Sequence, residues 1–403
     1  MEQDILQLEP ADFQEDRYAR LRLIPWWDQE RLKNAAIMVV GAGAIGNELI
    51  KNLSLLGIGR ILICDMDAIE STNLTRSVLY RAEDVGCNKA EVAAQRAMEM
   101  NPDVWAKALV GSIIDDVGLG VFRRMDVVLG GLDNREARLS INQSCYKVNR
   151  PWIDGAIEAL SGFARVFVPG QGACYECTMT ETDWMLINKR KSCALLTQEQ
   201  MAEGKIPTTP TSSSIIAGIQ VQEMLKLLHA DRNLPTLAGK GYVFNGLTHD
   251  SYVVEYQRKA DCMSHDTCEA IVETLWSVKT TTLKEILTAL RTELGERVVV
   301  ELDRDIATEA TCTCGGRKAL YTPVHRLTGS MLSCPQCGSR MSFRSLHTLR
   351  GDENFLDKTP YEIGIPPLHI IGARVGMHIT YYEFTADEAT VFDGLSAKGA
   401  AIP

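Results

Sequence analysis

Closely spaced cysteines are the residues of this sequence whose chemistry is easiest to specify. Most of the twelve cysteines fall into close pairs, which are Cys174 with Cys177, Cys262 with Cys268, Cys312 with Cys314, and Cys334 with Cys337. In a chain of this length, such thiols indicate a reducing compartment, where cysteines bind metal or catalyse rather than form disulfides. Because two pairs can supply the four thiolates of a tetrahedral Zn²⁺ site, the spacing predicts two zinc sites.

The first predicted zinc site combines Cys174, Cys177, Cys262 and Cys268. The gap between the last two cysteines is wide, and His265 lies inside it, where its imidazole could replace either thiolate. Four protein ligands leave no open position for a substrate, whereas a catalytic zinc keeps one. We therefore expect a structural zinc that joins distant segments of the chain.

The second predicted zinc site resembles a zinc ribbon. The stretches CTCGG and CPQCG carry its two knuckles, with Cys312, Cys314, Cys334 and Cys337 as ligands. Zinc ribbons can bind nucleic acid, but this chain has a formal net charge of -10 and a pI near 5.3. Because phosphate neutralisation needs clustered Lys and Arg, we expect a structural zinc here and no nucleic-acid partner.

Cys193 belongs to neither predicted zinc site. The basic run at 189–191 precedes it and a polar stretch typical of a surface loop follows it. Positive neighbours and exposure favour the thiolate, the form that a nucleophilic cysteine needs. The alternative is a small buried apolar residue. That alternative suits Cys64 and Cys145, which lie in apolar or helical sequence, better than it suits Cys193.

Upstream, glycines and an aspartate predict a nucleotide site. From Ala35 the sequence shows an apolar run, a glycine turn, a segment with helical periodicity and a second apolar run, which together predict a β-α-β unit. Gly41, Gly43 and Gly46 fit G-x-G-x-x-G, in which backbone amides and a helix N-terminus approach a phosphate. Asp65 follows about 20 residues later, where a carboxylate can bond ribose hydroxyls. The alternative is the same fold without a ligand.

Further polar residues follow at positions that favour a triphosphate over a dinucleotide. These are Asp67, Asn73, Arg76, Lys89 and Asp133. Arginine and lysine neutralise phosphates, and a carboxylate coordinates the accompanying Mg²⁺. Each of them could instead be an exposed ion-pair partner, an interpretation that fits Lys89 best if it is taken alone.

The order of these motifs resembles the E1-like superfamily of ATP-dependent adenylating enzymes. The resemblance rests on RYAR, GAGAIG, D-x-D-x-I-x-x-x-N-L-x-R, the lysine of NKAE, LDN, CYEC and SIIAGIQVQEMLKLL, and it covers roughly residues 17 to 268. The motif layout is most similar to that of compact single-chain activating enzymes for ubiquitin-like proteins, including bacterial ones.

The resemblance implies a role for each matching residue. Gly41, Gly43 and Gly46 would form the nucleotide loop and Asp65 would bind the ribose. Asn73, Arg76 and Lys89 would contact the phosphates, with Asp67 nearby, and Asp133 would hold Mg²⁺. Arg20 of RYAR would enter the ATP site of a partner subunit, which implies a homodimer. Cys193 would form a thioester with the activated partner, and the cysteine pairs around CYEC would hold zinc.

Several functions fit this resemblance to different extents. The leading hypothesis is an activating enzyme that adenylates the C-terminal glycine of a ubiquitin-like protein, forms a thioester on Cys193 and passes the protein to an E2-like carrier. A sulfur-carrier adenylyltransferase of the molybdopterin or thiamine type, which stops at the adenylate, explains the first 268 residues equally well. An inactive scaffold should have lost Arg76, Lys89 or Asp133, and all are present. A nicotinamide-dependent oxidoreductase is the remaining alternative.

The expected architecture is α/β with two domains. Residues 1–272 would form a Rossmann-like adenylation domain with a zinc site and the Cys193 loop. Residues 273–403 would form a smaller α+β domain that contains the zinc ribbon and recruits the carrier. Its sequence predicts a helix capped by Thr282 and Glu285 and ended by Gly295, followed by the strand RVVVELD. The sequence shows no signal peptide and no apolar run of ~20 residues, so we expect a cytoplasmic protein with no membrane partner.

Overall fold

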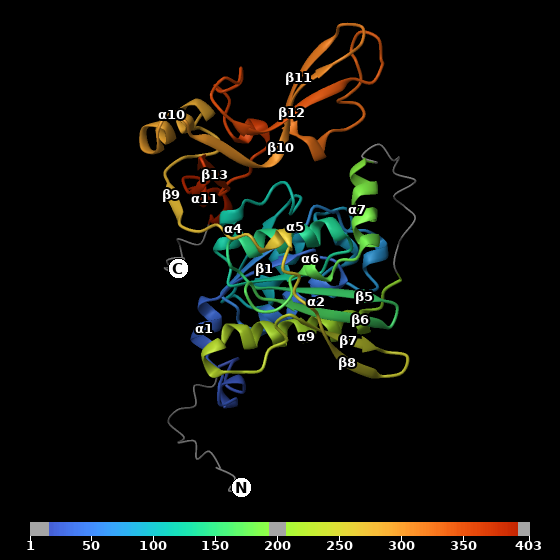
Figure 1. Cartoon of the computed structure of the whole chain (residues 1–403). Helices are drawn as coiled ribbons and strands as arrows, with labels where there is room; N and C mark the ends of the chain where they lie inside the picture. Colours follow the sequence, from blue (N-terminus) through green and yellow to red (C-terminus); the bar gives the residue numbers. More distant parts are fainter. Residues whose placement is uncertain (1–15, 193–206, 394–403) are drawn as a thin grey trace.

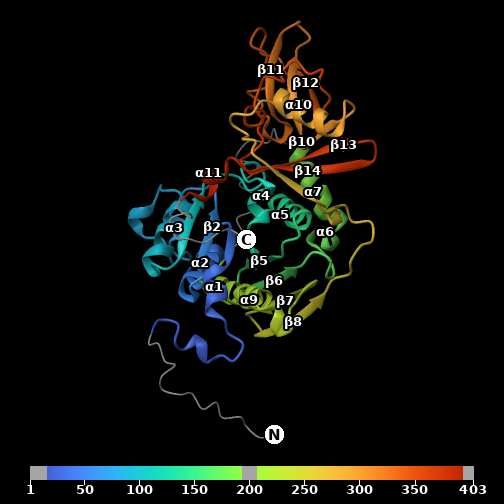
Figure 2. The same cartoon turned by 90° about the vertical axis from the view of Figure 1, so that its left-hand side faces the viewer.

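The computed structural model describes residues 16–192 and 207–393. Within these ranges the chain forms two β-sheets, an eight-stranded sheet whose strands lie between residues 36 and 255 and a six-stranded sheet whose strands lie between residues 271 and 384. In both views the second sheet lies next to α4 (Leu119–Arg123) and α5 (Arg135–Lys147), whereas α9 (Pro210–Leu228) lies on the opposite side of the first sheet (Figure 1, Figure 2).

The first sheet has the strand order β3-β2-β1-β4-β5-β6-β7-β8. Its strands are β1 (Ala36–Val40), β2 (Arg60–Cys64), β3 (Trp105–Leu109), β4 (Val127–Gly130), β5 (Trp152–Glu158), β6 (Ser161–Phe167), β7 (Lys240–Asn245) and β8 (Asp250–Glu255). The strands from β3 to β5 are parallel and the rest are antiparallel. Every residue of β1 and β2 is buried, as expected for parallel strands covered on both faces. This half has the expected Rossmann-like α/β architecture.

Helices cover both faces of the first sheet. On one face, α2 (Ala44–Leu56), α3 (Lys89–Met100) and α9 share a core with Ile37 and Val39 of β1. On the other face, α4 and α5 pack on Met38 and Val40. The short helices α1 (Gln29–Asn34) and α6 (Tyr175–Thr178) and the longer α7 (Glu181–Ser192) complete the helices around the first sheet. α2 ends before Gly57, which has the left-handed φ of 73° that favours glycine.

The second sheet has the order β11-β10-β13-β14-β9, and β12 also pairs with β10. Its elements are β9 (Ile271–Thr274), α10 (Leu283–Leu294), β10 (Val299–Thr311), β11 (Arg317–Pro323), β12 (Ser342–Leu349), β13 (Ile370–Val375), β14 (His378–Phe384) and α11 (Glu388–Phe392). The predicted capping box is confirmed, because Thr282 Oγ1 accepts from Glu285 N at 3.2 Å and Glu285 Oε2 accepts from Thr282 N at 2.7 Å. The predicted helix end at Gly295 and the following strand are also confirmed.

The two sheets share a hydrophobic core. Leu368, Ile370, Val391 and Phe392 belong to the same buried cluster as β1, α4 and α5. The first sheet ends with β8 at Glu255 and the second begins with β9 at Ile271, and the predicted domain boundary after residue 272 stays a prediction. Among the described residues, no helix is both long enough and apolar enough to cross a membrane.

Candidate functional site

The glycine loop connects β1 to α2 at the carboxyl edge of the parallel sheet. Gly41 has a φ of 89°, and a Cβ on Gly46 would lie 1.9 Å from the carbonyl oxygen of Gly41, so both positions require glycine for the fold. A Cβ on Gly43 would meet no atom within 4 Å. Gly43 caps α2 without any side-chain hydrogen bond. The first amides of α2 are therefore available to an anion.

Asp65, directly after β2, bonds the backbone of this loop. Its Oδ2 accepts from Ala42 N at 2.7 Å, and its Oδ1 accepts from Asp67 N at 2.8 Å. Burial raises the pKa of the Asp65 carboxyl, and the two backbone hydrogen bonds act in the opposite direction. Each carboxylate oxygen can accept more than one hydrogen bond, so Asp65 keeps capacity for ribose hydroxyls.

Lys89 and Asp67 lie beside Asp65. Lys89 is the first residue of α3, and its Nζ is 2.9 Å from Asp67 Oδ2. Arg76 and Asn73 lie in the connection between β2 and α3. Arg76 Nη1 donates to Thr72 O at 2.7 Å and forms no ion pair with the described residues. Asn73 Oδ1 accepts from Glu70 N at 2.9 Å, which closes the 3-10 turn Ser71–Asn73.

Asp133 lies at the same edge of the sheet. β4 is parallel to β1, and the loop after β4 approaches the glycine loop so closely that a Cβ on Gly41 would lie 2.6 Å from Gly131 O. Asp133 follows two residues later, is exposed, and precedes Asn134, the N-cap of α5. An exposed carboxylate here is chemically suited to a hard cation such as Mg²⁺.

Arg20 lies on a separate segment that Tyr18 anchors. Tyr18 is 3% exposed, and its hydroxyl accepts from Asn101 Nδ2 at 2.7 Å. Arg20 itself is exposed and makes no described contact with the glycine loop of its own chain. Its predicted action on a partner subunit stays a prediction. Cys193 lies outside the described residues, directly after the end of α7.

The first cysteine group contains Cys174, Cys177, Cys262 and His265, whose ligand atoms all lie within 4.8 Å of one another. Cys174 Sγ is 3.7 Å from Cys177 Sγ and 3.5 Å from Cys262 Sγ, and Cys177 Sγ is 3.4 Å from His265 Nε2. A tetrahedron with Zn–S bonds of about 2.3 Å has edges of about 3.8 Å, so the group fits zinc.

The structure corrects the predicted fourth ligand of this site, because His265 and not Cys268 joins the group. A 3-10 turn, Met263–His265, follows Cys262 directly and brings the imidazole back to the same side. The imidazole stacks on Tyr146 with a centroid distance of 4.9 Å. Cys268 lies further along the chain, where its N donates to Lys147 O at 2.8 Å and burial raises the pKa of its thiol to about 11.

The second cysteine group is the one predicted. Cys312, Cys314, Cys334 and Cys337 come together at the turn between β10 and β11 and the turn before β12. The Sγ atoms of Cys312 and Cys337 are 3.5 Å apart, and those of Cys314 and Cys334 are 3.6 Å apart. These spacings also fit a tetrahedral zinc ion.

Two residues that support the glycine loop were missed from the sequence. Asn47 is buried in α2, donates to Ala42 O at 2.7 Å and accepts from Leu79 N at 2.9 Å. The Tyr80 hydroxyl donates to Ala42 O at 2.6 Å. The sequence contains little signal for Asn47, because it lies on a different helix face from Ile45 and Leu49, and its burial follows from packing that the local pattern does not show.

A parallel sheet whose glycine loop, carboxylates and lysine meet at its carboxyl edge defines the class of nucleotide-binding α/β proteins. The sequence matches the ThiF family over residues 15–265. The chain therefore belongs to the ThiF family, within the E1-like superfamily.

The relatives include two kinds of activating protein. The chain is 31% identical over 224 residues to ubiquitin-like modifier-activating enzyme 5 of Dictyostelium discoideum, covering 52% of this chain and 57% of the relative. It is 37% identical over 170 residues to the sulfur carrier protein adenylyltransferase of Thermus thermophilus, covering 40% and 63%. The match spans about half the length of the first curated relatives.

A solved structure supports the fold. The structure of E. coli MccB with ATP matches with a TM-score of 0.53 at 24% identity, covering 63% of this chain and 75% of that one.

Proposed function

We propose that this protein binds ATP with Mg²⁺ and adenylates the C-terminal carboxylate of a ubiquitin-like or sulfur-carrier protein. One observation supports this proposal above the others. Asp65, Lys89 and the loop that carries Asp133 lie around the glycine loop, whose following helix α2 has no side-chain cap, in a member of the ThiF family. In this reaction a carboxylate oxygen of the partner attacks the α-phosphorus of ATP. The bond from that phosphorus to the bridging oxygen breaks, and pyrophosphate leaves.

The residues of the chain have positioning and charge-neutralising roles in this reaction. The free amides of α2 bind phosphate oxygens and Asp65 orients the ribose. Lys89, together with Arg76 and Asn73, neutralises charge that moves onto the leaving pyrophosphate. Asp133 would hold Mg²⁺, which supplies further charge neutralisation when bound. Holding the two reactants in the correct geometry provides much of the expected rate enhancement.

A second step on Cys193 extends the proposal. The Cys193 thiolate would attack the adenylated carbonyl, AMP would leave, and the thioester would then pass to an E2-like carrier bound by the second sheet. The basic run at 189–191 directly before Cys193 supports a reactive thiolate. Arg20, on the segment anchored by Tyr18, would complete the ATP site of the other subunit in a homodimer. Both cysteine groups would hold structural zinc.

The alternative is adenylation without a thioester, as in a sulfur-carrier adenylyltransferase. The 37% identity to the Thermus thermophilus protein over 170 residues favours keeping it as a second candidate. This alternative requires the same ATP site and leaves Cys193 without a covalent role.

ATP–pyrophosphate exchange in the presence of purified ubiquitin-like proteins with a C-terminal glycine tests the proposal. We expect exchange with the wild type and none with Lys89→Met, because the phosphates lose the lysine cation that faces them. Lys33→Met is the matched control, since Lys33 also pairs with a neighbouring carboxylate, that of Glu30, on the exposed surface of α1, and it should exchange normally. Absence of exchange with every ubiquitin-like protein and sulfur carrier would contradict the proposed function.

Non-reducing gels of the same reactions distinguish the two candidates. A reductant-sensitive adduct that disappears in Cys193→Ala, while exchange survives, indicates the thioester pathway. Exchange without any adduct indicates the sulfur-carrier pathway.

A further inference from the structure

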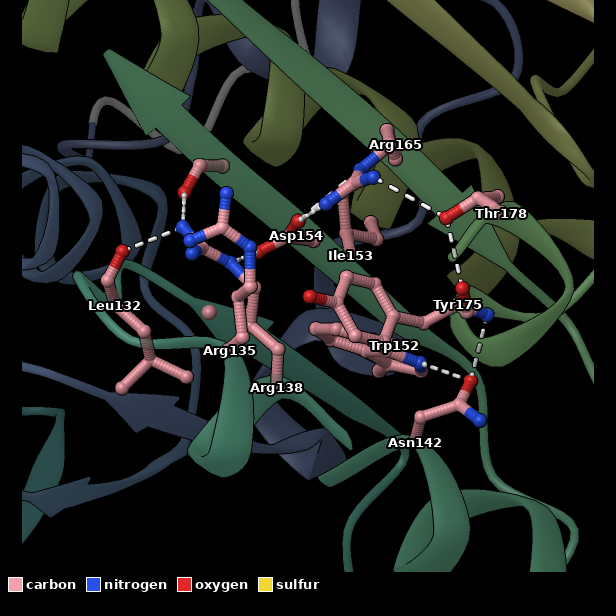
Figure 3. A network of polar contacts seen from close by, with 12 residues as sticks. Leu132, Arg135, Arg138, Asn142, Trp152, Ile153, Asp154, Arg165, Tyr175 and Thr178 are labelled. Atoms are coloured by element: carbon pink, nitrogen blue, oxygen red, sulfur yellow. Dashed lines mark hydrogen bonds and ion pairs between the residues drawn. The ribbon is translucent and has the colours of Figure 1, made fainter. Parts of the chain in front are cut away.

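Asp154 of β5 is completely buried and is bonded by two arginines (Figure 3). Arg138 Nε donates to Asp154 Oδ1 at 2.8 Å, and Arg165 Nη2 donates to Asp154 Oδ2 at 2.5 Å. Arg138 is 8% exposed. A buried ion pair is costly to form unless its remaining polar atoms are also bonded, so the other contacts of these arginines are informative.

Arg138 extends this network to the loop after β4 that carries Asp133, which we call the metal loop. Its Nη2 donates to Leu132 O at 2.5 Å and to Gly155 O at 3.3 Å. Leu132 immediately precedes Asp133, so the guanidinium holds the backbone at the residue before the predicted Mg²⁺ ligand (Figure 3). Because Asp154 fixes the orientation of Arg138, it also determines where the carbonyl of Leu132 is held.

Arg165 extends the network in the opposite direction, to α6. Its Nη1 donates to Thr178 Oγ1 at 3.3 Å, and Thr178 Oγ1 donates to Tyr175 O at 2.7 Å. Its guanidinium also lies 4.5 Å from the ring centroid of Phe163 and 4.9 Å from that of Tyr175. The network therefore reaches the short helix α6, which also carries Cys177 of the first cysteine group.

We propose that Asp154 is a positioning residue for the divalent cation, acting through Arg138 on the loop that carries Asp133. This inference rests on the proposed function, because it requires that a nucleotide and its metal bind at that loop. The competing explanation is that Asp154 only neutralises two arginines in the core. The two explanations differ in one measurable quantity, which is the affinity for the metal.

The probe is Mn²⁺, whose binding to the protein complexed with a non-hydrolysable ATP analogue is measured by electron paramagnetic resonance. The main variant is Arg138→Lys. Lysine keeps the positive charge beside Asp154 but lacks the planar fork that bonds Asp154 and Leu132 O together. We expect the Kd for Mn²⁺ to rise about tenfold, the lower end of the effect of removing a residue that orients a metal ligand. Asp154→Asn should give the same change if the variant folds.

Arg124→Lys is the matched control. Arg124 is as buried as Arg138, bonds the buried carboxylate of Glu383 and donates to Gly120 O at 2.9 Å, but it lies away from the metal loop. We expect both lysine variants to lower the melting temperature and only Arg138→Lys to weaken Mn²⁺ binding. Equal destabilisation with unchanged Mn²⁺ affinity in Arg138→Lys would overturn the inference. If wild-type protein bound no nucleotide analogue at all, the proposed function would fail and this inference with it.

Discussion

At the residue scale, the glycines after β1 differ in whether the fold or a bound phosphate excludes a side chain at their position. Gly46 allows α2 to pack on the loop, because a Cβ there would overlap the Gly41 carbonyl. Gly43 lies beside open space and has a φ of -75°, which any residue can adopt. The motif G-x-G-x-x-G therefore combines positions that the fold requires with one that a bound phosphate would require.

We expect Gly43→Ala and Gly46→Ala to separate binding from stability. Gly43→Ala should melt like the wild type but bind ATP about tenfold more weakly, a loss of about 1.4 kcal/mol, because the methyl group would occupy space next to the phosphate. Gly46→Ala should lower the free energy of unfolding by about 3 kcal/mol through overpacking. Calorimetric titration with ATP and thermal melts measure the two effects. Normal ATP affinity in Gly43→Ala would show that no phosphate approaches this position.

At the element scale, sequence patterns predicted the structural features that are determined by residues close together in the chain. The β1–α2 turn, the cap of α10 and each of the two knuckles of the second cysteine group depend on residues within one or two turns of chain, and the structure contains all of them. The first cysteine group could not be fully predicted. Spacing alone does not show that a 3-10 turn after Cys262 presents His265 and directs Cys268 toward α5.

Zinc content tests this corrected ligand set. We expect the wild type and Cys268→Ser to bind two zinc ions per chain, because Cys268 is not a ligand in the structure. His265→Ala should bind one zinc ion fewer or hold it weakly, and His265→Cys should restore the metal, since thiolate and imidazole both suit zinc. Mass spectrometry of metal content and chelator competition measure these outcomes. Loss of a zinc ion in Cys268→Ser would restore the original prediction that Cys268 is the ligand.

At the scale of the whole molecule, the two sheets are joined by contacts between residues far apart in sequence. Arg123 and Arg124 of α4 bond Glu383 of β14, a carboxylate with no exposed surface. Leu368 and Phe392 complete the core of the first sheet. No local pattern in the sequence contains this pairing, because each partner alone is an ordinary charged or apolar residue. The pairing depends on the tertiary structure, which brings these distant residues together.

Asp115 forms a second ionic contact between the parts of the molecule. His325 and Arg326, in the 3-10 turn after β11, bond Asp115 and Asp116, and Arg304 donates to the Asp115 carbonyl at 3.4 Å. Burial alone would raise the pKa of the Asp115 carboxyl. The hydrogen bond from His325 and the positive charges of His325, Arg326 and Arg304 outweigh burial, so that this pKa is lowered.

We therefore expect the stabilisation by Asp115 to depend on pH. A carboxyl whose pKa is lower in the folded protein stabilises it above the unfolded pKa of about 3.9, and the effect is lost as pH falls through the folded value. Urea unfolding should show Asp115→Asn to be less stable than the wild type by about 1 kcal/mol at pH 7, with the difference shrinking below pH 4. Asp305→Asn, beside the exposed His347, is the matched control and should have little effect at either pH. A constant cost of Asp115→Asn between pH 7 and pH 3 would mean that the contact with His325 and Arg326 is not ionic in the folded protein.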